Sequence, residues 1–133
     1  MSIPTPETLK KQRTVLLTTY KRDGTPVGTP VNVVVLDGRV YFRTYHTAWK
    51  VRRLRNDPRA TIAPSRFLGE PTGPAARGRA RPLDDAEAEP VRRALARKHP
   101  FQQGVLVPLA HRLMRLRTTH YEFILEDARE AVA

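Results

Sequence analysis

Apolar and polar positions alternate most clearly in the stretch from Arg39 to Thr44. Val40 and Phe42 fall on one face of this segment, and Tyr41 and Arg43 fall on the other. This period of two is typical of a half-buried strand. β-branched, aromatic and alternating residues predict further strands on both sides of it. The six predicted strands cover residues 14–20, 25–36, 39–44, 59–64, 75–83 and 118–125.

Turn signals separate several of these strands. Asp-Gly pairs at residues 23–24 and 37–38 predict two tight hairpins that join the first three strands in series. Pro26 and Pro30 cannot donate backbone hydrogen bonds, so the second strand is expected at an edge or a bulge. Residues 65–74 are rich in glycine and proline and predict an irregular loop that covers a site or reaches a partner.

Three segments change to the helical period. Residues 7–13 predict a lead-in helix with Thr5 as N-cap. A short basic helix follows Thr47 as N-cap and ends at residues 56–58. A longer helix is expected over residues 86–99, capped by Asp84 or Asp85. Residues 101–114 show no clear period.

These elements predict a mainly β (α+β) fold. Six strands joined mostly as hairpins, with one short helix before strand four and one longer helix before strand six, favour an antiparallel barrel, because closure removes exposed edges. The length of 133 residues suits a single domain over residues 1–133. A deep ligand site in so short a chain is expected to need a second subunit.

Composition narrows the chemistry. The chain has no cysteine, so disulfides and thiolate chemistry are excluded, and any redox reaction must come from a bound cofactor. No apolar run is long enough for a membrane span and no secretory signal is evident, so we expect a cytoplasmic protein without membrane partners. The formal net charge is +11, but arginine-rich composition alone is weak support for a nucleic-acid partner.

The distribution of charge is more informative than its sum. Between residues 39 and 66, Asp57 is the only acidic residue against eight Lys and Arg, whereas residues 84–89 form an acidic cluster. A positive potential around the basic helix favours an anionic ligand there. The alternating Arg77, Arg79 and Arg81 predict either a solvated strand face or a ligand or interface role.

Lys50 and Arg53 are the main candidates for holding an anion. They are three residues apart on one helical face, so two cations can converge on one phosphate or carboxylate. Thr44 and Thr47 add hydroxyl donors near the helix start. Trp49 and Tyr45 are candidates for a flat ring ligand. The alternatives are a solvated surface helix and aromatic residues that simply pack at an interface.

Other site types lack support in the sequence. The four histidines, His46, His99, His111 and His120, have no metal-ligand spacing, so no metal site is expected. Neither serine lies in a nucleophile motif, and glycine-rich phosphate loops are absent from the sequence. Hydrolase and dinucleotide-fold functions are therefore disfavoured, and no catalytic residue is assigned.

The stretch VYFRTYHTAWKVRRLRNDPRATIAP, together with TVLLTTYKRDGTPVGTPVNVVV before it and GEPTGPAARGRARPL after it, resembles the pyridoxamine 5′-phosphate oxidase-like split-barrel superfamily. Within that superfamily it is most similar to the flavin- or deazaflavin (F420)-dependent oxidoreductases. The resemblance implies a six-stranded split β-barrel that forms a homodimer, with a cofactor in each of two grooves at the subunit interface.

The resemblance also implies residue roles. Lys50 and Arg53 would hold the cofactor phosphate or the F420 tail, with Arg43 and Thr44 contacting the same region. The segment formed by Pro30, Val31, Asn32 and Val33 would lie along the ring system. Ala48-Trp49-Lys50 replaces the serine-arginine-lysine run of the flavin-binding oxidases, which favours F420 over FMN.

The implied activity is F420H2-dependent reduction of an unidentified, electron-poor small molecule. A different class of function uses the same barrel as a non-catalytic module for FMN, haem or another anionic ligand. Binding of nucleic acid by the basic surface is a third hypothesis and the least favoured.

Overall fold

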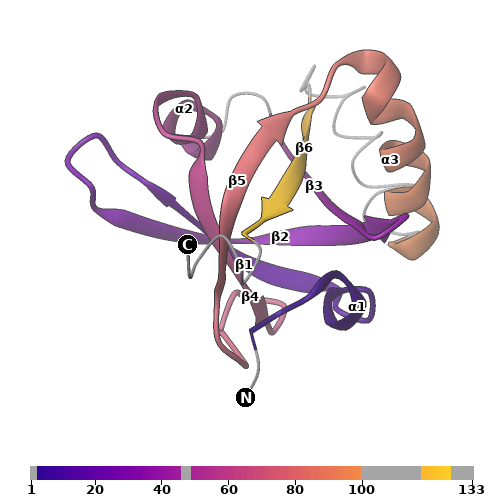
Figure 1. Cartoon of the computed structure of the whole chain (residues 1–133), viewed down its shortest axis with the longest axis horizontal. Helices are drawn as coiled ribbons and strands as arrows, with labels where there is room; N and C mark the ends of the chain where they lie inside the picture. The colour runs from indigo at the N-terminus through magenta and orange to yellow at the C-terminus, as the bar shows by residue number, and fades with distance from the viewer. Residues whose placement is uncertain (1–2, 46–48, 100–117, 127–133) are drawn as a thin grey trace.

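Six antiparallel strands close into a barrel in the order β1-β2-β3-β6-β5-β4 (Figure 1). This is a computed structural model of the chain, and it describes residues 3–45, 49–99 and 118–126. The strands are β1 (Thr14–Tyr20), β2 (Pro26–Leu36), β3 (Arg39–Tyr45), β4 (Arg59–Ser65), β5 (Ala76–Pro82) and β6 (Thr118–Leu125). The predicted mainly β, closed antiparallel architecture is confirmed, and homodimerisation stays a prediction.

The described residues also form three helices outside the barrel strands: α1 (Pro6–Leu9), α2 (Trp49–Asn56) and α3 (Asp85–Lys98). Asp84 caps α3, accepting from the backbone N–H of Glu87, whose side chain bonds back to the cap. In the part of the chain that the structure describes, no helix combines the length and apolar character needed to cross a membrane. The unpatterned residues 101–114 lie outside the described residues.

The lead-in helix is shorter than its composition predicts. It ends at Leu9, which is buried in the core, instead of at Arg13. The Gln12 side chain then donates to the carbonyl oxygens of Thr14 (3.0 Å) and Ser65 (2.8 Å), which ties the approach to β1 onto the end of β4. Tertiary hydrogen bonds thus override the helix-forming tendency of residues 10–13.

The inward faces of the strands fill the barrel. Phe42 of β3 stacks on Tyr121 of β6 with ring centroids 5.1 Å apart, among buried valine, leucine and alanine side chains. Gly78 of β5 lies where a Cβ would overlap the backbone oxygen of Ile124 and the ring of Phe123. A glycine is therefore required at this point for the β5–β6 approach.

Helix α3 covers the outside of the barrel. Its buried Val91 and Leu95 pack against the outward-facing Val34 of β2 and Tyr41 of β3, as the helical spacing predicts. At the end of α3, the buried His99 ring lies 3.2 Å (Nε2) from the Val33 carbonyl oxygen. The helix is thus attached to β2 by both apolar packing and a hydrogen bond.

Strand β2 changes partners along its length. Residues 26–32 pair with β1, whereas pairing with β3 runs only from Val33 opposite Phe42 to Leu36 opposite Arg39. Pro26 and Pro30 therefore lie in the half of β2 that has one strand neighbour among the described residues. The edge position expected from the two prolines is confirmed.

Candidate functional site

An open groove lies between α2 and the turn that joins β1 to β2. Its volume is about 960 Å³. Lys21, Arg22 and Val27 line it from the β1–β2 hairpin, and Trp49, Arg52, Arg53, Arg55 and Asn56 line it from α2. Five of these eight described lining residues are cationic and none is acidic, so the groove has the donor set for an anion carrying several charges.

The hairpin that forms one wall extends beyond the barrel (Figure 1). Strand β4 pairs with β1 only as far as Thr18, opposite Thr61. Beyond it, Thr19 and Tyr20 pair with Val27 and Pro26 of β2. We call this projecting part, residues 19–27, the arm. Because it carries Lys21 and Arg22 at its end, the arm brings two cations from a turn up to the basic helix.

Helix α2 forms the other wall because one side of it is apolar. Val51 and Leu54 are each 4% exposed, and Leu54 joins the barrel core. Packing this side inward leaves the arginines of the helix on its remaining surface. The helical prediction from Val51 and Leu54 is therefore confirmed, and the same spacing explains why Arg52 and Arg55 face the groove.

Arg53 is held in place by the arm. Its Nε donates to Thr19 Oγ1 across 2.7 Å, and Thr19 is 1% exposed. A guanidinium presents five donors in a fixed fork, so one bond at Nε leaves the remaining donors for a ligand. Arg53 is thus an oriented cation of the groove.

Trp49 is the exposed aromatic residue of the groove. Its side chain is 69% exposed, and the guanidinium carbon of Arg52 lies 5.1 Å from its ring centroid. This cation–π contact positions a flat surface beside the cationic wall. An exposed indole in such a place can stack on a planar ligand, as the sequence predicts for Trp49.

Lys50 lies on the same helix but does not line the groove. It is half-buried, and burial lowers the pKa of its ammonium group, with a further contribution from the positive charge of Arg53. Arg53 lines the groove and Lys50 does not, so their convergence on one anion stays a prediction. An anion bound beside them would relieve both effects.

The strand residues proposed for the cofactor ring lie where β2 and β3 diverge. Val31 and Val33 point into the core, while Pro30 is exposed and Asn32 is half-buried. The side chains of Val31 and Val33 are therefore committed to packing. Backbone groups of residues 30–32 remain the part of this segment that could contact a ring, and that role stays a prediction.

Arg43 and Thr44 lie on opposite faces of β3. Strand alternation places Thr44 on the inner side with Phe42, and Arg43 on the outer side with Tyr41. Arg43 is 8% exposed, so the strand is more deeply covered here than its half-buried pattern predicts. The two residues therefore do not present their side chains to one common region, and neither lines the groove. Thr47 lies outside the described residues, as do His46 and His111.

Sequence reasoning missed six of the eight described lining residues of the groove, because it named only Trp49 and Arg53 as site residues. Arg52 and Arg55 could have been found, because a helical wheel places them beside Arg53 once Val51 and Leu54 face inward. Lys21, Arg22 and Val27 gave no local signal. Their role depends on a tertiary feature, the extension of the arm past β4, which the sequence pattern does not reveal.

Comparison with known proteins agrees with this architecture. The sequence profile described as pyridoxamine 5′-phosphate oxidase matches residues 5–124. The chain belongs to this family. Comparison with curated proteins gives no match.

Solved structures with the same fold include three informative examples. A protein of unknown function from Agrobacterium tumefaciens superposes with a TM-score of 0.72 at 20% identity, over 90% of this chain and 50% of that protein. The haem storage protein HutZ from Vibrio cholerae has a TM-score of 0.69 at 16% identity, over 92% and 87% of the two chains. An FAD-binding protein from Mesorhizobium loti has a TM-score of 0.61 at 17% identity, over 91% and 84%.

These neighbours differ in what they bind. The chain spans half the length of the Agrobacterium protein, and identities at or below 20% establish the shared fold alone. The pyridoxamine 5′-phosphate oxidase fold thus occurs in an FAD-binding protein and in a haem storage protein. The ligand of the present family member has to be argued from its own groove.

Proposed function

We propose that this family member is an F420H2-dependent reductase that holds the deazaflavin cofactor by its anionic tail in the groove between α2 and the arm. The main support for this proposal is the lining of the groove. Its described residues include five cations and an exposed indole, and none of them is acidic. FMN carries a single phosphate, whereas the phosphate and carboxylates of the F420 tail extend over a longer path. The number and spread of cations therefore favour F420 over FMN.

In this proposal, the residues of the protein bind the cofactor and orient it. Arg53, fixed by Thr19, provides oriented donors for the tail, and Lys50 adds a second positive charge at the same helix. Trp49 offers a flat surface, and the backbone groups of residues 30–32 would hold the ring system. Bound F420H2 would supply the hydride, so the protein needs no acid–base dyad of its own. Its contribution is position and charge complementarity.

A partner subunit completes the site in this proposal. The groove is open on the described chain, and a reductase has to exclude water around the reacting ring. A homodimer would supply the second wall, with the acceptor being a small, electron-poor molecule. Size-exclusion chromatography with light scattering measures this directly, and a monomer that still binds F420 tightly would contradict the dimeric part of the proposal.

Fluorescence titration of the protein with F420 and with FMN tests the cofactor. We expect quenching by F420 at micromolar concentration and much weaker binding of FMN. Absence of F420 binding would reject the reductase. Oxidation of F420H2 in the presence of a panel of nitroaromatic and quinone acceptors, followed by absorbance, then tests turnover.

The second candidate is a non-catalytic module that binds FMN, haem or another anionic ligand. The structural similarity to the haem storage protein HutZ favours it, because the fold alone does not require turnover. Haem titration followed at its Soret band separates the two candidates. Tight haem binding without F420 binding would support the module and contradict the reductase.

A further inference from the structure

Three arginines lie outside the groove on the neighbouring strands. Arg59 of β4 is directly opposite Arg79 of β5, and Arg77 lies two residues further along the same outward face. All three are exposed. Asp57 binds Arg59 through both carboxylate oxygens, at 3.0 and 2.9 Å, which offsets part of this charge. None of these three arginines lines the groove, so the proposed cofactor site does not explain them.

The two sets of cations are continuous along the chain and in space. Helix α2 ends at Asn56, which lines the groove, and Asp57 and Arg59 follow within three residues. On the arm, Tyr20 lies two residues beyond Thr18, which pairs with Thr61 of β4, and Arg59 lies two residues before Thr61, so the antiparallel register brings Tyr20 level with Arg59. The base of the arm therefore connects the groove with the arginines of β4 and β5.

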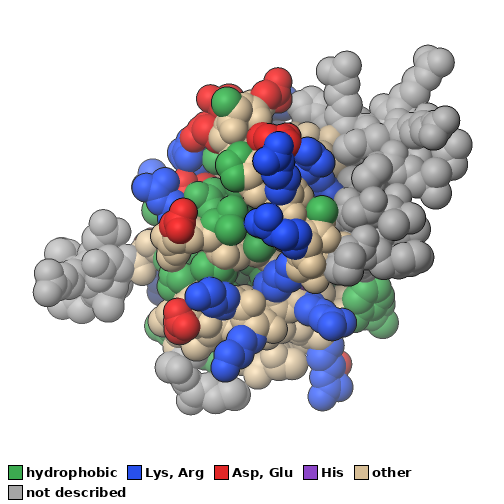
Figure 2. Space-filling view, turned by 90° about the vertical axis from the view of Figure 1, so that its right-hand side faces the viewer, with side chains coloured by type: hydrophobic (Ala, Val, Ile, Leu, Met, Phe, Trp, Pro, Cys, Tyr) green, Lys and Arg blue, Asp and Glu red, His purple; other side chains and the backbone are tan. Residues whose placement is uncertain are grey.

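We call the combined surface the cationic band. It consists of Lys21, Arg22, Arg52, Arg53, Arg55, Arg59, Arg77 and Arg79. The acidic residues beside this band are Asp23 in the arm, Asp57 in the turn between α2 and β4, and Glu126 after β6, whose backbone N–H donates to the Arg77 carbonyl oxygen at 3.0 Å. The face that carries α3 is different, because Lys and Arg there are interspersed with Asp and Glu (Figure 2). Along the arm, α2, β4 and β5, cations therefore outnumber carboxylates by a wider margin than they do on α3.

We propose that the cationic band binds single-stranded nucleic acid. A strand carries one phosphate per nucleotide, so its charge is spread along a path that can follow the groove and then β4 and β5. Trp49 is exposed and stacked by Arg52, and Tyr20 is half-exposed beside Arg59, which provides aromatic surfaces among the cations. Proteins that bind single strands combine such features because unpaired bases stack on aromatic rings.

The shape of the site favours a single strand over other polyanions. A single strand can enter the groove between the arm and α2 and reach the half-buried Arg53, whereas a flat lipid surface would contact only the exposed residues of the lining. A duplex keeps its bases stacked inside, and Trp49 would have no base to contact. This activity goes beyond the proposed reductase but shares its groove, so nucleic acid and cofactor should compete for Arg53.

Fluorescence anisotropy with a fluorescein-labelled oligothymidylate of roughly 15 nucleotides tests the band, using the full chain over about 50–200 mM NaCl. The test variant carries Arg77→Ser with Arg79→Ser, which lies outside the groove and leaves the cofactor residues intact. The matched control carries Arg93→Ser with Arg97→Ser on α3, with the same change of charge. Both variants are also titrated with F420 and FMN.

We expect the test variant to bind the oligonucleotide more weakly, with a salt slope smaller by about 1.4, because two phosphate contacts are lost. The control should bind like the unmodified protein, and both should keep their cofactor affinity. No binding at about 100 mM NaCl, equal loss in test and control, or equal affinity for a duplex of the same length would each overturn the proposal. Oligonucleotide binding by an unmodified protein that binds neither F420 nor FMN would support the band and reject the reductase.

Discussion

Arg53 of α2 donates to the hydroxyl of Thr19 across 2.7 Å, so a buried residue of β1 fixes a cation of the groove. The bond joins the two walls of the groove, because Thr19 belongs to the arm. The bond therefore links the position of α2 to the position of the arm. Because it orients Arg53, we expect Thr19 to affect ligand affinity although it does not line the groove.

Thr19→Val should weaken binding of an anionic ligand without unfolding the protein. Valine keeps the shape of threonine but removes the acceptor, so the Arg53 side chain loses its anchor and must be ordered by the ligand. We expect a loss of about 1 kcal/mol in binding free energy, smaller than the loss for Arg53→Ala. Titration of both variants with F420, alongside circular dichroism, measures this. Equal affinities of Thr19→Val and the unmodified protein would show that the anchor has no effect.

Lys50→Ala combined with Arg53→Ala should discriminate between parts of the cofactor. If these residues hold the phosphate and tail, the double variant should lose far more affinity for F420 than for a deazaflavin that lacks the tail. The expected loss for F420 is on the order of 3 kcal/mol, because two charge-assisted contacts are removed. Equal losses for the two ligands would place these cations away from the tail.

The arginine row on β5 shows what strand alternation can and cannot predict. Arg77 and Arg79 point outward opposite the buried Ala76, Gly78 and Ala80, as expected. Period two is a local property of the backbone, so the sequence reveals it directly.

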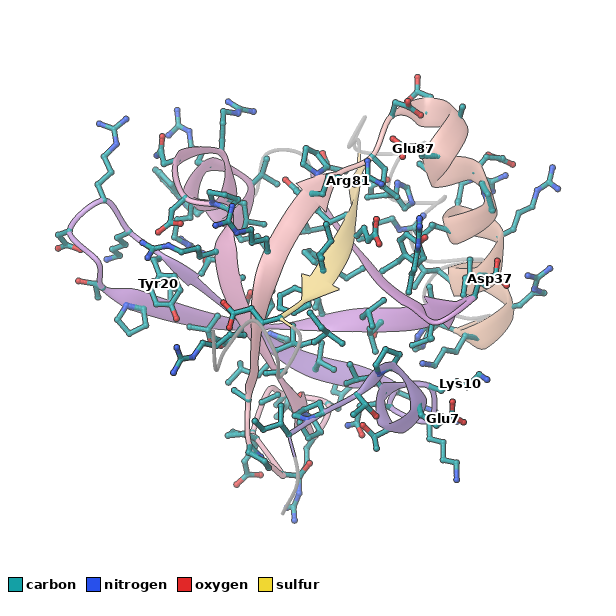
Figure 3. All side chains as sticks on the ribbon, viewed as in Figure 1. Glu7, Lys10, Tyr20, Asp37, Arg81 and Glu87 are labelled. Atoms are coloured by element: carbon teal, nitrogen blue, oxygen red, sulfur yellow. The ribbon has the colours of Figure 1, made fainter. Side chains whose placement is uncertain are left out.

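Arg81 on the same face follows the pattern but has a role that no pattern shows. It bonds to Glu87 of α3 at 2.9 Å, and the two residues face each other in Figure 3. It also bonds to the buried Glu122 of β6 at 3.0 Å. The carboxylate of Glu122 is also 3.8 Å from Arg39. Glu122 is 41 residues from Arg81 in sequence and meets it only after β6 pairs with β5, and the contact with Glu87 depends on how α3 folds back beside β5.

The candidate site illustrates the same limit. The sequence identifies α2 as basic and Arg53 as a candidate, since charge and helical spacing are local. It does not reveal that neither Arg43 nor Thr44 lines the groove, or that Lys21 and Arg22 join it through the arm. Those facts depend on where β2 leaves β3 and where β1 extends past β4.

Arg81→Gln should loosen the start of α3. The two hydrogen-bonded carboxylates, Glu87 first and Glu122 second, hold the pKa of Arg81 above its usual range, so the guanidinium stays charged at all accessible pH values. Without it, Glu122 keeps only the more distant Arg39 among its described ion pairs. We expect a lower melting temperature and faster amide exchange at residues 85–88. Arg77→Gln, on the same strand with the same change of charge, is the control and should change neither.

Gly78→Ala should destabilise the barrel strongly. The new methyl group would overlap the carbonyl oxygen of Ile124 and the ring of Phe123, and backbone cannot move aside as a flexible side chain can. We expect a loss of roughly 3 kcal/mol in unfolding free energy by urea denaturation. Gly28→Ala is the matched control, because its Cβ would meet only the flexible Leu16 side chain, at 3.0 Å. Similar stabilities of the two variants would contradict the close β5–β6 approach.

His99 should make the protein less stable as the pH falls. Burial lowers the pKa of its imidazole, and the positive charges of Lys98 and Arg13 add to this, although the bond to the Val33 carbonyl acts in the opposite direction. Below the unfolded-state pKa of about 6.5, the unfolded chain binds a proton that the folded chain resists. The free energy of unfolding therefore decreases as the pH drops through that value, until the folded-state pKa is passed.

His99→Gln isolates this effect, because glutamine can donate to Val33 but does not titrate. Urea denaturation of both proteins at about pH 7.5 and 5.0 should show a larger loss of stability at the lower pH for the unmodified protein. The difference is at most about 1.4 kcal/mol per pH unit. The other three histidines are common to both proteins, so their titration cancels in the comparison. Equal losses of unfolding free energy between the two pH values in the unmodified protein and the variant would show that His99 is as easily protonated in the folded protein as in the unfolded chain.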